Sequence, residues 1–156
     1  MIRILCIGKN KDKALVSLEK EYLKRLSAFD KVQLEEVKDE PNTLTDRPAE
    51  AAKVKETEGK RVLDRIKPNE FVVLLDLHGT MPDSETFAAS LQTWHDRAPV
   101  TFVIAGSLGP SPQLINRANY RLKLSDLTFT HLMTRVLLLE QTYRAFMINA
   151  GRSYHK

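Results

Sequence analysis

The chain has 156 residues, the size of one ordinary domain, and 42% of them are hydrophobic. The single cysteine, Cys6, excludes a disulfide framework and a zinc site built from cysteine and histidine ligands. No apolar stretch approaches the roughly 20 residues that a membrane-spanning helix needs, and the N-terminus lacks a signal-peptide pattern. We therefore expect a soluble, cytoplasmic protein with no membrane partner.

The formal net charge of +4 is unevenly distributed along the chain. Residues 117–156 contain seven Lys or Arg and two acidic residues, a net charge of +5, whereas the remaining residues carry a net charge of −1. This asymmetry predicts that a phosphate-rich partner meets one end of the molecule. Composition alone fits a solvated basic face without a partner equally well.

Short apolar runs rich in β-branched residues alternate along the chain with longer segments of helical periodicity. We expect strands at residues 2–7, 32–37, 71–77, 100–105 and 120–124, and helices at 14–26, 48–66, 82–97, 111–118 and 131–150. Residues 38–47 are predicted to form a loop. Strict alternation of this kind predicts an α/β fold, a mostly parallel sheet with helices on both faces, in a single domain over residues 1–156.

Ligands bind outside the carboxyl ends of the strands in such open sheets, which singles out residues 75–79, 106–109 and 125–129. Gly106 and Gly109 would allow a flat ligand to approach the backbone closely. Their spacing matches neither the dinucleotide fingerprint nor the P-loop, and an ordinary turn between a strand and a helix accounts for them as well.

A polar, turn-forming loop at residues 124–131 connects the fifth strand to the last helix. Thr128 or Thr130 could cap that helix and bring its N-terminus close to the ligand site. The alternative is a capping loop with no further role. A hydrolytic triad of Ser107, Asp126 and His131 is rejected because Ser107 is not part of a G-x-S-x-G motif.

A helical projection of the last helix places a polar stripe, which contains His131 and Arg135, beside a wide apolar arc. An arc of this width predicts burial on more than one side, against the sheet and against a partner subunit. Glu140 and Arg144 fall within the arc at the i, i+4 spacing, and we expect an internal ion pair that stabilises the helix or the dimer.

The segment 102–156, with the motifs IAGSLG, LSDLTFTH, RVLLLEQTYRA and a terminal YHK, resembles the ribosomal large-subunit RNA methyltransferase H family. The resemblance extends over essentially the whole chain. It implies a trefoil-knotted SPOUT fold, a homodimer, and transfer of a methyl group from S-adenosyl-L-methionine to N3 of a pseudouridine in large-subunit (23S) ribosomal RNA, on assembled ribosomes. Two departures are Ala105, where the family usually has Gly, and Thr130, where it usually has Pro.

The resemblance also implies which residues form the site, with no metal among its components. The implied cofactor contacts, largely through backbone groups, are Leu75, Ala105, Gly106, Gly109, Leu124, Ser125, Asp126, Leu127, Thr128 and Phe129. A valine at position 106 is accordingly expected to fill the cofactor slot while leaving the fold intact.

Arg135 and, less directly, His131 are assigned to catalysis, since a cationic pocket would stabilise a developing imide anion. The basic tail offers phosphate contacts and an aromatic ring for base stacking through Arg152, Tyr154, His155 and Lys156, with a frayed terminus as the alternative. Two other functions are consistent with the same residues: a non-catalytic RNA-binding or ribosome-assembly module, and methylation of another acceptor such as a transfer RNA.

Overall fold

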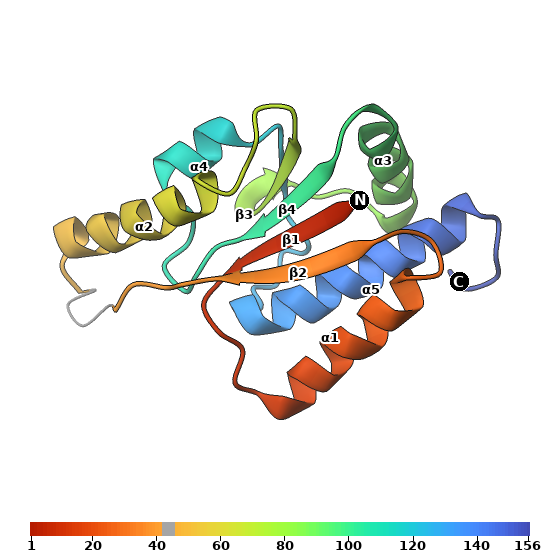
Figure 1. The fold of residues 1–156 in the computed structure, drawn as a ribbon, viewed down its shortest axis with the longest axis horizontal. Coiled ribbons are helices and arrows are strands. Elements are labelled where there is room, and N and C mark those ends of the chain that lie inside the picture. The colour runs from red at the N-terminus through yellow and green to blue at the C-terminus, as the bar shows by residue number, and fades with distance from the viewer. Residues whose placement is uncertain (42–45) are drawn as a thin grey trace.

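The computed structural model describes residues 1–41 and 46–156, and it confirms the predicted alternation of strands and helices (Figure 1). The elements are β1 (Ile2–Ile7), α1 (Lys13–Leu26), β2 (Val32–Val37), α2 (Pro48–Leu63), β3 (Phe71–Thr80), α3 (Ser84–Arg97), β4 (Val100–Ile104), α4 (Pro112–Arg117), β5 (Tyr120–Leu122) and α5 (His131–Asn149). The predicted loop at 38–47 lies partly outside the described residues. No described helix has the length and apolar character needed to cross a membrane.

All five strands pair in parallel in one sheet with the order β2-β1-β4-β3-β5. Helices α2 and α4 cover one face of this sheet, and α1, α3 and α5 cover the other (Figure 1). The predicted α/β architecture with helices on both faces is therefore confirmed. The threading of a trefoil knot stays a prediction.

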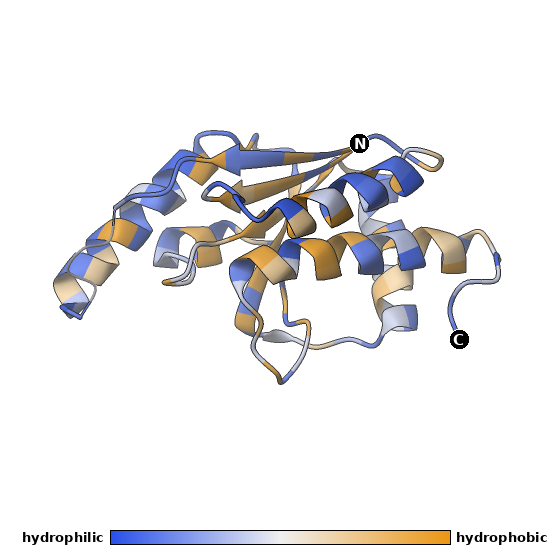
Figure 2. Ribbon diagram, turned by 90° about the horizontal axis from the view of Figure 1, so that it is seen from below, coloured by the Kyte–Doolittle hydropathy of each residue, from blue (hydrophilic) through white to orange (hydrophobic). Residues whose placement is uncertain are grey.

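Side chains alternate between the two faces along each central strand, so that two cores form. On β1, Ile4 and Cys6 belong to the core under α1, α3 and α5, whereas Leu5 and Ile7 belong to the core under α2 and α4. Hydrophobic residues concentrate in the central strands, and the helices alternate between hydrophobic and hydrophilic residues (Figure 2). Burial raises the pKa of the Cys6 thiol to about 12, so this cysteine is an inert core residue.

Two element boundaries differ from the predicted ones by three residues, and the others agree to within two residues. Strand β3 continues to Thr80 because residues beyond Leu75 pair with β5 again after an irregularity in register. A side chain at Gly79 would stand 2.5 Å from the carbonyl oxygen of Arg121, so only glycine permits this second pairing. Helix α2 ends at Leu63 and not at Ile66, since Pro68 disfavours a helical conformation in the residue before it and the chain leaves the helix through tight turns.

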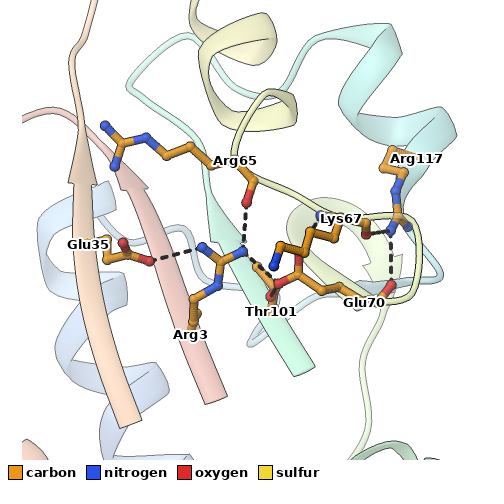
Figure 3. A network of polar contacts seen from close by, with 7 residues as sticks. All are labelled: Arg3, Glu35, Arg65, Lys67, Glu70, Thr101 and Arg117. Carbon is orange, nitrogen blue, oxygen red and sulfur yellow. Dashed lines mark hydrogen bonds and ion pairs between the residues drawn. The ribbon is translucent and has the colours of Figure 1, made fainter. Parts of the chain in front are cut away.

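A network of polar contacts fixes the amino end of the sheet (Figure 3). The buried carboxylate of Glu70 accepts hydrogen bonds from Thr101 Oγ1 and from Arg3, each at 2.6 Å. Burial acts to raise the pKa of Glu70, but these hydrogen bonds and one from the backbone N–H of Lys67 lower it overall. Arg117 donates to the carbonyl oxygens of Lys67 and Glu70. The loop before β3 is thus held at the edge of the sheet opposite the candidate site.

Candidate functional site

A cavity of about 900 Å³ lies at the carboxyl ends of β3, β4 and β5. Nine of the ten residues predicted to contact a cofactor line it: Leu75, Ala105, Gly106, Gly109, Leu124, Ser125, Leu127, Thr128 and Phe129. Asp126, the tenth, does not line the cavity, because its exposed carboxylate accepts a hydrogen bond from Lys123 Nζ at 2.6 Å. A second cavity of about 390 Å³ adjoins the first through Leu122, Lys123, Leu124, Ser125 and Phe129.

The turn after β4 owes its shape to two local features. Gly109 has a φ of +87°, a left-handed conformation that favours glycine, and its N–H donates to the carbonyl oxygen of Gly106 at 3.0 Å. Ser111 then caps α4 by accepting a hydrogen bond from the N–H of Leu114. The backbone from Gly106 to Ser111 is thereby held along one side of the cavity.

The expectation that a valine at position 106 would fill the cofactor slot assumed that its side chain points into the cavity, and this assumption is wrong. A Cβ atom added to Gly106 would stand 3.2 Å from Oε1 of Glu58 and 3.5 Å from Ile7, so a side chain there meets α2 and β1. It would therefore strain the fold, which was expected to stay intact. Ala105 belongs to the core under α2 and α4 and also lines the cavity.

The loop after β5 leads directly into α5, as predicted. Thr130 is the residue that caps α5, because its Oγ1 accepts a hydrogen bond from the N–H of Met133 at 3.2 Å. The usual family proline at this position is thus replaced by a capping threonine. The positive end of the α5 dipole lies at the cavity, where it favours negative charge.

His131 is the first residue of α5 and lines the cavity. Burial lowers its pKa, and the positive charge of Arg135 lowers it further, while Asp39 opposes both effects. The imidazole is consequently neutral at pH 7. A neutral imidazole accepts a proton, whereas the expected role in a cationic pocket requires a protonated ring.

Arg135 does not line the cavity, although it lies one turn after His131. Its side chain is 0% exposed, with Nη1 2.7 Å from Oε2 of Glu36 and Nη2 donating to the carbonyl oxygen of Gly8 at 2.9 Å. Glu19 lies 3.8 Å away on α1. Although a helical projection places Arg135 on the same polar stripe as His131, its guanidinium does not reach the cavity, because three segments far away in the sequence enclose it.

The C-terminal tail folds back onto the second half of α5 (Figure 1). The ring of Tyr154 packs edge-on against Tyr143 with 5.0 Å between centroids, and its hydroxyl lies 3.3 Å from Glu140. His155 lies 3.1 Å from Arg144, which forms the predicted ion pair with Glu140.

Helix α5 has 19 residues, so at about 1.5 Å per residue its two ends lie nearly 30 Å apart. The guanidinium of Arg152 lies 5.2 Å from the ring centroid of Phe29. No tail residue lines the larger cavity of its own subunit, but Tyr154 and His155 lie against Glu140 and Glu85, whose chain neighbours Gln141 and Ser84 line the smaller cavity.

Part of the excess positive charge in residues 117–156 is paired with acidic residues from earlier in the chain, and the remaining pairs lie within the segment. Arg121 lies 3.1 Å from Asp76, Lys123 binds Asp126, and Arg135 and Arg144 bind glutamates. The expectation of a basic end of the molecule is therefore weaker than the count of charges indicates, since acids from the first half of the chain neutralise part of it.

The residues that line the cavity without having been predicted as site residues include Asp12, Leu15, Lys55, Asp76 and His78. Asp76 and His78 follow β3 and lie within the segment that the strand-end rule singles out. The others belong to α1 or α2, or to the cap of α1, where a helical pattern carries no sign that they face a ligand. Among the described residues, no group of three or more His, Cys, Asp or Glu side chains is arranged to hold a metal ion.

Comparisons with known proteins show which family the chain belongs to. A family model described as "Predicted SPOUT methyltransferase" matches residues 1–155. The chain is 46% identical to ribosomal RNA large subunit methyltransferase H of Listeria monocytogenes and of Bacillus cereus, and 45% identical to that of Ligilactobacillus salivarius, over 99% of each chain.

A crystal structure of a methyltransferase from Bordetella pertussis Tohama I has the same fold, with a TM-score of 0.58, 12% identity and 93% of both chains covered. The chain therefore belongs to the SPOUT methyltransferases and, among them, to the ribosomal RNA large subunit methyltransferase H family.

Proposed function

We propose that the protein methylates N3 of a pseudouridine in large-subunit (23S) ribosomal RNA, with S-adenosyl-L-methionine as methyl donor, on assembled ribosomes in the cytoplasm. One observation carries the proposal: the cavity at the strand ends is lined by nine of the ten predicted cofactor contacts, in a chain about 45% identical to methyltransferases named for that RNA. Two adjoining cavities separated by one loop suit a reaction in which two ligands meet.

The residues present fit S-adenosyl-L-methionine. The cavity of about 900 Å³ is within the usual range for cofactor sites, and Leu75, Leu124 and Phe129 offer apolar surface for a flat base. Backbone groups of the turn at Gly106 and of the loop before α5 supply hydrogen bonds. The bound cofactor supplies an electrophilic methyl carbon, so the reaction requires no metal.

The remaining chemistry is the loss of a proton from N3 of the target ring. The neutral imidazole of His131 accepts this proton in our proposal, which leaves the ring nitrogen with the electron pair that forms the new bond. The N-terminus of α5 stabilises the negative charge that develops on the ring. Arg135 acts indirectly, by holding the first turns of α5 against β1 and β2.

We further propose a homodimer, on different grounds from those in the sequence. Helix α5 packs between α1 and α3 of its own subunit, and this packing accounts for much of its wide apolar arc. Five exposed hydrophobic side chains lie on segments around the cavity instead: Leu77, Met81, Leu127, Phe129 and Met133. A second subunit covering this surface would bury it and could present its tail to the cavity.

Isothermal titration with S-adenosylhomocysteine tests the cofactor proposal directly. We expect one molecule bound per subunit, and weaker binding when Leu75 is replaced by Asp, because a charge would then lie against the apolar part of the ligand. Binding of RNA without any binding of S-adenosylhomocysteine would support the alternative of a non-catalytic module.

A further inference from the structure

Helix α2 contacts both ends of the turn that lines the cavity after β4. A Cβ atom added to Gly59 would stand 2.3 Å from Oγ of Ser111, so the helix backbone and this fully buried cap are in direct contact. Glu58, the preceding residue, lies beside Gly106 at the other end of the turn. Two consecutive residues of α2, Glu58 and Gly59, thus pack against the two ends of the turn.

The carboxyl group of Glu58 connects three segments. Its Oε1 lies 3.2 Å from the position that a Cβ atom would take at Gly106, and its Oε2 accepts a hydrogen bond from the N–H of Glu40 at 3.1 Å. The residue is only 5% exposed, and it does not line the cavity. The group is therefore placed to act on the turn and not on a ligand.

The neighbouring charges leave this carboxyl group without an ion pair of its own among the described residues. Arg61, whose positive charge acts on Glu58, binds Glu40 and donates to the carbonyl oxygens of Lys38 and Asp39. Burial raises the pKa of Glu58, partly offset by the hydrogen bond from Glu40. Burial of a carboxyl group without a cationic partner costs free energy, so we expect such a group to have a specific role in its surroundings.

We propose that Glu58 is a positioning residue. It holds the Gly106 turn in the position that cofactor binding requires and so sets the affinity of the cavity for the cofactor. The inference rests on the proposed function, since it assigns the same cavity to the cofactor. It also explains why position 106 is glycine: a methyl group there would push against Glu58 and tilt the turn.

A double-mutant cycle between Gly106 and Glu58 tests this coupling, with the affinity of the full-length protein for S-adenosylhomocysteine as readout. We expect Gly106→Ala to weaken binding roughly tenfold, an ordinary effect for residues in direct contact. Glu58→Ala should weaken binding severalfold, and Glu58→Gln, which keeps the shape and an acceptor for Glu40, should restore it. The double variant Gly106→Ala/Glu58→Ala should bind more tightly than Gly106→Ala alone, because the added methyl group then has room.

Glu56→Ala is the matched control, since it removes the same side chain from an exposed position on the same helix. It should leave the affinity unchanged, and thermal unfolding of every variant shows whether the fold persists. Effects of the two single variants that merely multiply in the double variant would overturn the inference, as would wild-type affinity in Glu58→Ala. A wild-type protein that binds no S-adenosylhomocysteine would defeat the proposed function itself, and this inference with it.

Discussion

Arg135 on α5 and Glu36 on β2 form an ion pair with 2.7 Å between Nη1 and Oε2, although 99 residues separate them in the sequence. The arginine is fully buried and also donates to the carbonyl oxygen of Gly8, where the chain turns with a φ of +99°. The first turns of α5, and with them His131, are thereby tied to the carboxyl ends of β1 and β2.

Replacing Arg135 with Ala should destabilise the protein by about 3 kcal/mol, because the change leaves Glu36 and the buried Glu19 without their cation. Arg135→Met, which fills the same space, should cost less. Urea unfolding measures both, and Arg25→Ala serves as the control because its ion pair with Glu21 lies at the surface. An effect of Arg135→Ala no larger than that of the control would contradict the proposed tie.

The pH profile of methyl transfer should reflect a neutral His131. Because burial and then Arg135 lower its pKa below the ordinary 6.5, the imidazole becomes protonated only below pH 6.5, and activity should fall as the pH drops through that lowered pKa. His131→Ala should reduce kcat by about 10²-fold or more and remove this acidic limb. Arg135→Met should move the limb to higher pH, since it removes one of the two lowering effects.

The same shift predicts a contribution to stability. The unfolded chain takes up a proton at His131 near pH 6.5 whereas the folded chain does not, so stability should fall as the pH decreases from 6.5 to the folded pKa.

The role of His131 in the reaction is tested separately by the activity. A pH profile of kcat that is identical in wild type and in His131→Ala would exclude His131 as the proton acceptor.

Gly109→Ala should lower both stability and cofactor affinity. Its φ of +87° is strained for any side chain, at a cost of about 1–2 kcal/mol, although nothing lies within 4 Å of an added Cβ atom. Gly151→Ala is a matched control with a φ of +68° at the far end of α5. It should cost similar stability in urea unfolding without changing the calorimetric affinity for S-adenosylhomocysteine. Equal losses of affinity in both variants would indicate that the Gly109 turn is not part of the site.

Removal of residues 154–156 should weaken RNA or ribosome binding far more than cofactor binding, and should make the dependence of RNA affinity on salt shallower. Mixed dimers of a tail-less chain with a full-length His131→Ala chain show which subunit supplies the tail. If each tail serves the cavity of its partner, one site of the mixed dimer is intact and turnover approaches half of wild type. If each tail serves its own subunit, both sites are defective and turnover is lost. Full activity of the truncated homodimer would remove the tail from the site altogether.

The sequence predicted the elements well where a single local signal decides them. Strands β1 and β2 matched to the residue because apolar runs end at turn-forming residues. The location of the cavity followed from the rule on strand ends, which needs only the order of elements and the parallel sheet, whereas the individual cofactor contacts were implied by the family resemblance. Thr130 was one of two candidate caps, and its hydrogen bond to Met133 distinguishes it from Thr128.

Contacts between distant segments could not be predicted in this way. A helical projection places Arg135 on a polar stripe, but it contains no information about Glu36 on β2 or Glu19 on α1, which bury it. The direction in which Gly106 would point a side chain depends on where α2 crosses the sheet, and the sequence of the turn does not specify that. Charge counts overstated the basic character of residues 117–156 for the same reason, since the acid opposite Arg121 lies 45 residues earlier.

Labelled methyl transfer tests the central claim most directly. The protein is incubated with S-adenosyl-L-methionine carrying a labelled methyl group and with free 23S RNA, isolated 50S subunits or 70S ribosomes, and the modified nucleotide is mapped. The account predicts that the label reaches N3 of a pseudouridine in the large-subunit RNA of assembled ribosomes, and that His131→Ala slows the transfer by about 10²-fold or more. Absence of label in all three substrates, from a protein that binds S-adenosylhomocysteine at one molecule per subunit, would contradict it.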